Sequence, residues 1–273
     1  MEIDPRLHFI TAALYFVLGW RVFVAQRAGT GGTWSGWSMV RMLTLAGLAV
    51  HGIMLHFALF PDNRLDLSLG QSLSLIAWVT VAMYWVASFR FPLGVLEPLI
   101  LFGASGLVLM PLVLPSDKPV PYSGLWTFKV HLVVSLMAYG LFAIAALHAV
   151  LMGILEKRLH NHDRLPRMGS MPSLVAMDAL LFQMILAGFL LLTATLISGI
   201  FFSEALFGKP LTFNHKVIFS FISWLIYGGL LAARQIWGIR GRRAARWTLA
   251  GFAMLLTAYV GSKFVLEILL HRG

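Results

Sequence analysis

Long apolar stretches separated by short polar connections make up most of the chain. Eight of these stretches come close to or exceed the roughly 18 to 20 residues with which a helix crosses a bilayer. They are Leu7–Val24, Leu43–Phe60, Leu69–Phe89, Leu99–Leu114, Val130–Leu155, Ala179–Phe202, Val217–Ala233 and Trp247–Leu270. Because backbone amides in lipid must be hydrogen-bonded within their own segment, each stretch is predicted to be an α-helix. The pattern therefore predicts an all-α fold, a polytopic membrane helical bundle with eight transmembrane helices.

The composition is that of a lipid-covered protein. Of the 273 residues, 59% are hydrophobic and 12% are charged, with a mean hydropathy of +0.83, whereas about a quarter of the residues in a soluble domain are charged. The first stretch lacks a basic leader and a cleavage site of small residues, so we interpret it as a retained helix rather than a signal peptide. We expect residues 1–273 to form a single transmembrane domain.

The basic residues predict the orientation of the helices. With eight spans both termini lie on one side, and Lys and Arg gather on the cytoplasmic side. Twelve basic residues belong to connections one, three, five and seven, most densely at Leu155–Arg167 and Trp237–Arg246, and eight belong to the other side. We therefore expect these odd-numbered connections to be cytoplasmic and the N and C termini to lie outside.

The same distribution accounts for the net charge of +10. Basic residues that follow the positive-inside rule do not indicate nucleic acid as a partner; a contact with lipid head groups or a partner protein is their alternative use. The chain has no cysteine, which excludes disulfides, thiolate zinc sites and iron–sulfur ligation. No Gly-rich phosphate loop, paired carboxylates or Ser/His/Asp motif indicates hydrolytic or nucleotide chemistry.

Nine histidines stand out in so apolar a chain, because ionisable groups inside a membrane are costly and are functional candidates by default. A helical rise of about 1.5 Å per residue sorts them by depth. Four lie near the outer ends of predicted spans: His56, His131, His215 and His271. His51 lies near the middle of the second span, and His148 lies about 25 Å deeper than His131. The others lie at the first helix start or in a polar connection: His8, His160 and His162.

Depth and helical phase decide which of these imidazoles can share one ligand. His51 and His56 point about 140° apart around one helix, so they cannot bind one haem together. Two kinds of grouping between helices remain possible. One is formed by the outer histidines of different helices, and the other pairs His51 with a deeper partner. For each histidine the alternative is a structural role, either at a solvated helix end or in a hydrogen bond to a neighbouring helix. Because no thiolate or carboxylate accompanies them, an imidazole pair suits haem iron better than structural zinc.

Three segments carry the pattern of a known family. They are residues 67–78 (LSLGQSLSLIAW), 131–140 (HLVVSLMAYG) and 214–227 (NHKVIFSFISWLIY). In that order they resemble the Leu-Ser-Asn-Leu-Tyr-Glu-Ser-Leu stretch, the His-Val-Ser-x-Met-x-x-Ser-Tyr-Ala helix and the Asp-Pro-Lys-Glu-Thr-Trp-Ala-Phe-Ile-Thr-Trp segment of the integral-membrane cytochrome c assembly proteins. Within that family the CcsA- and HemX-like branch, and above all its short YpjD-like members, is the most similar.

The resemblance implies a protein of the bacterial cytoplasmic (inner) membrane that holds or moves haem at the outer leaflet. It implies that His131 is the first axial ligand of a non-covalently bound haem b and that His271, near the outer end of the last span, is the second. His56 is an alternative to His271, and the deeper His51 is a candidate for a transit site. No metal besides haem iron is expected.

The resemblance also implies supporting residues and partners. His215, Lys216 and Trp224 are expected to support the haem, with Lys216 or Lys129 pairing with a propionate group. For Trp224 a role as an interfacial anchor or packing residue is favoured over a direct contact with haem. Membrane lipid and other cytochrome c assembly proteins are the expected partners.

Two departures from the family pattern lead to a second hypothesis. The connection Ser203–Asn214 has no tryptophan where the family has a tryptophan-rich loop, and Ala232 stands where the family has a histidine. In this hypothesis the chain is a non-catalytic membrane scaffold or accessory subunit that has lost haem, and its basic connection Arg240–Arg246 docks a partner. A secondary transporter is disfavoured because no internal repeat or pair of broken helices is evident. Neither hypothesis predicts intrinsic enzymatic turnover.

Overall fold

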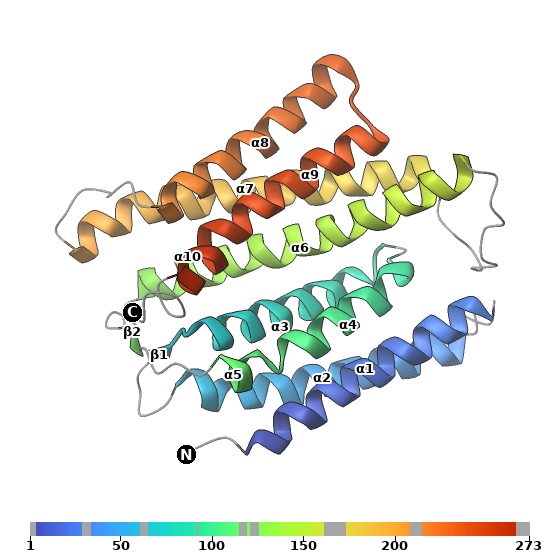
Figure 1. Ribbon diagram of the computed structural model, residues 1–273, viewed down its shortest axis with the longest axis horizontal. Helices are drawn as coiled ribbons and strands as arrows, with labels where there is room; N and C mark the ends of the chain where they lie inside the picture. Colours follow the sequence, from blue (N-terminus) through green and yellow to red (C-terminus); the bar gives the residue numbers. More distant parts are fainter. Residues whose placement is uncertain are drawn as a thin grey trace. The chain divides into compact units, whose positions relative to one another are not determined.

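The computed structural model describes residues 4–28, 34–60, 65–91, 93–114, 119–120, 126–160, 173–207 and 215–265. These residues are nearly all helical (Figure 1). The chain divides into two compact units. Unit 1 consists of Met1–Pro119 with Lys157–Ser173, and unit 2 consists of Val120–Glu156 with Leu174–Gly273. The prediction of an all-α fold is confirmed.

Unit 1 begins with three long helices that run in alternate directions (Figure 1). These are α1 (Pro5–Arg27), α2 (Trp34–Leu59) and α3 (Leu69–Ala87). The 3-10 turn η2 (Gly94–Leu96) leads into α4 (Glu97–Leu107), and the single turn α5 (Met110–Val113) follows. Two short strands, β1 (Leu65–Asp66) and β2 (Pro119–Val120), form a small sheet.

Local sequence explains where some of these helices begin. The side chain of Asp4 caps α1 by accepting a hydrogen bond from the backbone N–H of Arg6 at 2.9 Å, and Pro5 starts the helix where no N–H donor is needed. Pro111 lies in the first turn of α5, so the fourth span is divided between α4 and α5. The backbone of α5 lies so close to α3 that a Cβ on Gly70 would be 2.8 Å from the Cα of Pro111.

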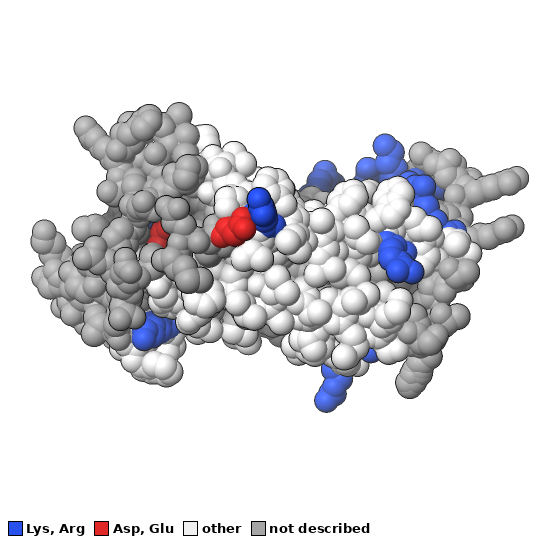
Figure 2. Space-filling view, turned by 90° about the horizontal axis from the view of Figure 1, so that it is seen from below, with Lys and Arg blue, Asp and Glu red and all other residues white. Residues whose placement is uncertain are grey.

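The interior of unit 1 contains a small group of polar side chains among apolar ones. Tyr15 on α1, His51 on α2 and Ser74 on α3 are all fully buried. α1 packs on α2 and α4, and α3 packs on α2, α4 and α5. Figure 2 shows that the face over α1 is mainly uncharged, with Lys and Arg gathered mostly towards one end. Such an uncharged belt is typical of a surface covered by lipid.

Unit 2 contains four long helical segments, again in alternate directions (Figure 1). They are most of α6 (Trp126–His160), α7 (Leu174–Phe207), α8 (His215–Trp237) and α9 (Gly241–Leu256). α9 continues through the π-helical segment η3 (Thr257–Gly261) into α10 (Ser262–Phe264). The tight turn between α8 and α9 uses Gly238 and Gly241, which have positive φ angles of 63° and 59° that favour glycine.

An aromatic stack forms the centre of unit 2. The rings of Phe142 on α6 and Tyr227 on α8 are fully buried and stack with their centres 3.9 Å apart. Each ring lies against a glycine of another helix. A Cβ on Gly188 of α7 would be 2.8 Å from the Phe142 ring, and a Cβ on Gly251 of α9 would be 2.8 Å from the Tyr227 ring. These two glycines therefore allow four helices to pack closely around the stack.

Seven helices of the described residues are long and apolar enough to cross a membrane. They are Pro5–Arg27, Ser38–Leu59, Leu69–Ala87, Gly94–Val113, Trp126–Arg158, Leu174–Phe201 and His215–Trp237. They correspond to the first seven stretches predicted from the sequence. The eighth, Trp247–Leu270, is helical as far as Val265, and its last residues lie outside the described part of the chain. The eighth span and the outside placement of the termini therefore stay predictions.

Candidate functional site

His131 lies in the second turn of α6 and is partly buried. Its Nδ1 is 2.8 Å from the Oγ of Ser198 on α7. The next residue of α7 is Gly199, at which a Cβ would lie 3.5 Å from the Cε1 of the His131 ring. The hydroxyl and the small neighbouring residue thus hold the imidazole against α7 in one orientation.

The hydroxyl of Ser198 lies between two possible hydrogen-bond partners. Besides Nδ1 of His131, it is 3.0 Å from the backbone carbonyl of Thr195, to which it can donate its proton. Since a hydroxyl has a single proton, Ser198 accepts the hydrogen bond from the Nδ1–H of His131 when it donates to that carbonyl. The lone pair of the neutral ring then lies on Nε2. In this tautomer a histidine binds a metal through Nε2 while a second residue orients its Nδ1–H.

A cluster of cations and aromatic rings joins α6, α8 and the last helical turns of the described chain. The amino groups of Lys216 on α8 and Lys263 on α10 lie 5.7 and 5.5 Å from the centre of the Tyr259 ring. The Tyr259 ring is 5.9 Å from that of Tyr139 on α6, whose hydroxyl donates to the carbonyl of Leu255 at 2.8 Å. Tyr259 belongs to η3, and π-helical turns within α-helices are frequent at functional sites. This cluster provides positive charge at the end of unit 2 where α8 begins.

His51 has a different environment. It is fully buried in α2, and its Nε2 is 2.9 Å from the Oγ of Ser74 on α3. Its Nδ1 is 3.3 Å from the hydroxyl of Tyr15 on α1, whose ring packs edge-on against it. Both ring nitrogens therefore contact side chains of neighbouring helices. Binding of iron by this imidazole requires that one of these two contacts is broken.

The other histidines chosen from the sequence lie at helix ends. His56, in the last turn of α2 in unit 1, is exposed and contacts the rings of Phe57 and Phe60. His215 is the first residue of α8 in unit 2 and is exposed. His271 lies outside the described residues. Its role as a second axial ligand therefore stays a prediction.

Trp224 packs α8 against α7. Its indole ring stacks on Phe189 with the ring centres 5.4 Å apart. Its indole N–H donates to the Oγ1 of Thr193 at 2.9 Å. These contacts match the interpretation of Trp224 as a packing residue. Lys129, suggested as a partner for a propionate, is exposed in the first turn of α6.

Comparison with known proteins identifies the family. The family model described as "Cytochrome C assembly protein" matches residues 39–270, which is most of the chain. The chain belongs to the cytochrome c assembly protein family. The resemblance inferred from three short segments is therefore confirmed. Membership of this family supports a role in cytochrome c biogenesis and implies the involvement of haem.

Individual relatives in this cytochrome c assembly family differ in how much of the chain they cover. The inner membrane protein YpjD of Escherichia coli is 27% identical over 237 residues, which are 86% of this chain and 89% of YpjD. An uncharacterized 28.8 kDa protein of Azospirillum brasilense is 31% identical over 147 residues, or 54% of each chain. The cytochrome c biogenesis protein CcsA of Prochlorococcus marinus is 39% identical over 89 residues, which are 33% of this chain and 28% of CcsA. Together with the seven apolar helices, these matches show a multi-pass inner-membrane protein.

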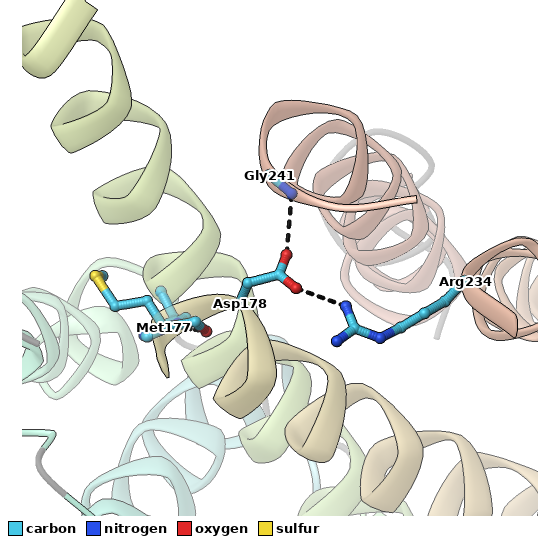
Figure 3. Close-up of polar contacts among 5 residues, drawn as sticks. Met177, Asp178, Arg234 and Gly241 are labelled. Carbon is cyan, nitrogen blue, oxygen red and sulfur yellow. Dashed lines mark hydrogen bonds and ion pairs between the residues drawn. The ribbon is translucent and has the colours of Figure 1, made fainter. Parts of the chain in front are cut away.

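This member of the cytochrome c assembly family also contains a polar contact that the sequence reasoning missed. Asp178, in the first turns of α7, binds the Nη1 of Arg234 at 2.6 Å and accepts the backbone N–H of Gly241 at 2.9 Å (Figure 3). On the preceding residue, Met177, the carbonyl accepts a hydrogen bond from the Nε2 of His148 at 2.9 Å. Asp178 therefore joins α7, α8 and the start of α9. The available signal was an acidic residue next to a long apolar stretch.

Proposed function

We propose that this chain binds haem b non-covalently and holds or moves it at the outer leaflet during cytochrome c biogenesis, with His131 as an axial ligand. The observation that carries the proposal is the contact of 2.8 Å between Nδ1 of His131 and the hydroxyl of Ser198. In the proposal Nδ1–H donates to this hydroxyl, so that the lone pair of the neutral ring lies on Nε2. The family membership supports the proposal independently, because relatives of this chain include a protein named for cytochrome c biogenesis.

The residues around His131 fit the requirements of an axial ligand. Axial ligation needs a neutral imidazole with a fixed orientation, and a hydrogen bond from Nδ1–H to a second residue provides both. Haem supplies an iron centre that takes axial nitrogen ligands and changes its oxidation state. The amino groups of Lys216 and Lys263 are suited to carboxylates such as the propionates.

The remaining candidates have defined places in this proposal. His271 is the second axial ligand, and His56 is the alternative. His51 is a transit site, which the haem reaches only when the contact of His51 with Tyr15 or Ser74 opens. Each of these assignments is tested by a single substitution that leaves His131 in place.

The proposal includes the membrane topology derived from the sequence. Eight spans in a single transmembrane domain, residues 1–273, place both termini outside and the basic connections in the cytoplasm. His131 and His215 then lie near the outer surface, where an assembly partner that supplies or receives haem can approach. A reporter enzyme that works only in the cytoplasm should be active when it is fused after Arg246. An inactive reporter would reverse the orientation and move the haem site to the inner leaflet.

A second function is favoured by the contacts of His51 and Trp224. Both nitrogens of His51 contact protein side chains, and the indole N–H of Trp224 is bonded to Thr193, so neither residue needs haem to satisfy its polar atoms. The connection Ser203–Asn214 also contains no tryptophan. These observations suit a scaffold or accessory subunit without haem, which docks a partner through Arg240–Arg246.

Purification from haem-replete cells separates the two functions. The wild-type protein in mild detergent should show the Soret and α bands of bis-imidazole haem in a reduced-minus-oxidised spectrum. Replacing His131 by Ala should remove these bands. A colourless wild-type protein that also fails to bind added haemin would exclude haem handling and leave the scaffold.

His8 offers a matched control in the same experiment. It is buried, and its Nδ1 is 2.9 Å from the backbone carbonyl of Val108, so a glutamine can replace it as a donor. The variant His8→Gln should retain its haem. If a monodisperse His8→Gln protein loses haem to the same extent as His131→Ala, the assignment of His131 is wrong.

A further inference from the structure

A groove of about 400 Å³ lies between α7 and α8 of unit 2. Its walls are mainly apolar and are formed by Ala179, Phe182 and Leu186 of α7 and by Leu231 and Ala232 of α8. The three residues of α7 are spaced i, i+3 and i+7 and therefore lie on one helix face. Leu186 is 50% exposed, so the groove opens onto the surface that faces lipid in a membrane-spanning helix.

One end of this groove is cationic. Arg234 lines it, together with the amide side chains of Gln183 and Gln235. The guanidinium of Arg234 lies over the Phe182 ring, 3.8 Å from its centre, and its Nη1 binds Asp178. A guanidinium has five N–H donors in a planar fork, so it can bind a carboxylate and a phosphate oxygen at the same time. None of the described residues that line the groove is acidic.

Asp178 brings further arginines to the same end. The carboxylate that binds Arg234 also accepts the backbone N–H of Gly241 (Figure 3), so the start of α9 is fixed beside the Arg234 side chain. The arginines next to this contact are all exposed: Arg240, Arg242, Arg243 and Arg246. Cations in the first turn of a helix are opposed by the helix dipole, and a bound anion offsets this repulsion.

We propose that this groove binds one anionic phospholipid, with an acyl chain along the apolar wall and the phosphate at Arg234 and the arginines of early α9. The length of the groove suits a chain in one leaflet: Asp178 and Leu186 are about 12 Å apart along α7, and the hydrocarbon of one leaflet is about 15 Å thick. The charge selects the head group, because a zwitterionic lipid brings an ammonium group towards the arginines and an anionic lipid does not.

Ala232 makes the groove accessible and gives the means to close it. It is exposed on α8 and lines the groove, so a large side chain at this position fills the space without entering the helix interface. Neither Ala232 nor the early arginines of α9 belong to the proposed haem site. The lipid site can therefore be tested independently of haem binding.

Native mass spectrometry of the full-length protein in detergent tests the proposal. Phosphatidylglycerol and phosphatidylcholine with identical acyl chains are titrated in parallel. The wild-type protein should bind the first phosphatidylglycerol molecule about tenfold more tightly than the first phosphatidylcholine molecule, a difference of about 1.4 kcal/mol. Equal affinity for the two lipids would overturn the proposal.

Three variants assign the site within the same titration. Ala232→Phe should weaken phosphatidylglycerol binding about tenfold, whereas Ala250→Phe, at an exposed alanine of α9 that does not line the groove, should not. The double variant Arg242→Gln/Arg243→Gln should lose the preference for the anionic lipid and keep the affinity for phosphatidylcholine.

Two results with Ala232→Phe would contradict the lipid site. One is unchanged phosphatidylglycerol binding. The other is a change from an oligomer to a monomer, which would show that a second copy of the chain occupies the groove. The haem content of Ala232→Phe should equal that of the wild type, so failure of the lipid proposal and failure of the haem proposal give different results.

Discussion

The two units of this chain place histidine differently. At the centre of unit 1, His51 is fully buried and contacts Ser74 and Tyr15 with its two ring nitrogens. The centre of unit 2 is instead an aromatic stack of Phe142 and Tyr227. The candidate axial ligand in that unit, His131, is partly buried, with the hydroxyl of Ser198 at its Nδ1.

This difference teaches how a structural histidine is told apart from a candidate ligand. Burial in a membrane helix marks both residues as functional candidates, so burial alone does not decide. The contacts differ: the two ring nitrogens of His51 contact side chains of two neighbouring helices, whereas Nδ1 of His131 contacts a serine hydroxyl that can orient the ring for ligation through Nε2. We therefore expect His131 to bind the resident haem. We expect His51 to stabilise unit 1 and to act as a transit site only when one of its two contacts opens.

The largest expected effect is on haem content. His131→Ala should lose essentially all haem, and His51→Ala should retain it, because only the first substitution removes an axial ligand. Haem per chain in the purified proteins, measured as the pyridine haemochrome, gives the answer. The reverse pattern would exchange the roles of the two histidines.

The second effect concerns the stability of unit 1. His51→Ala leaves a cavity and two buried hydroxyls without their partner, so the free energy of unfolding should fall by about 3 kcal/mol. Ser74→Ala, which removes one contact, should cost only about 1 kcal/mol. Thermal unfolding of the haem-free proteins in detergent measures both. A His51→Ala protein as stable as the wild type would show that the buried network does not stabilise unit 1.

The third effect tests the aromatic centre of unit 2. A methyl group on Gly188 would meet the Phe142 ring at 2.8 Å, so Gly188→Ala should destabilise the protein by about 2 kcal/mol despite its better helix propensity. Gly229 is exposed on α8 with open space around it. Gly229→Ala should therefore be neutral or stabilising in the same unfolding assay. If Gly188→Ala and Gly229→Ala proved equally stable, the Phe142–Tyr227 stack would tolerate a shift of α7.

The smallest effect sharpens the role of Ser198. Ser198→Ala removes the hydroxyl that contacts Nδ1 of His131 and should weaken haemin binding about tenfold with the fold intact. Ser198→Thr keeps a hydroxyl and should recover most of the affinity. A haemin titration followed by absorbance measures both variants. If Ser198→Ala, Ser198→Thr and the wild type bound haemin with identical affinity, Ser198 would have no role in haem binding.

The helical architecture was largely predictable from sequence because lipid imposes long apolar segments. Seven predicted stretches correspond to helices long enough to cross a membrane, including the short fourth one at Leu99–Leu114. The π-helical turn at Thr257–Gly261 was not predictable, since it depends on packing rather than on a local motif.

The candidate site was only partly predictable. His131 was found from its depth and from the family resemblance, but Ser198 was not, because a single serine in an apolar helix has no distinctive pattern. Its contact with His131 joins residues 67 positions apart. The partners of His51 lie 23 and 36 positions away. The side chains that each histidine contacts are therefore a property of helix packing, which the sequence pattern does not contain.

The most direct test of the central claim is rescue of a His131→Gly variant by imidazole. Without imidazole, the purified variant should lack the haem spectrum of the wild type. Added imidazole and haemin should restore the bis-imidazole bands, because the free ligand occupies the place of the missing side chain. A variant that keeps the wild-type spectrum without imidazole would contradict the claim that His131 is an axial ligand, as would a monodisperse variant whose spectrum imidazole fails to restore.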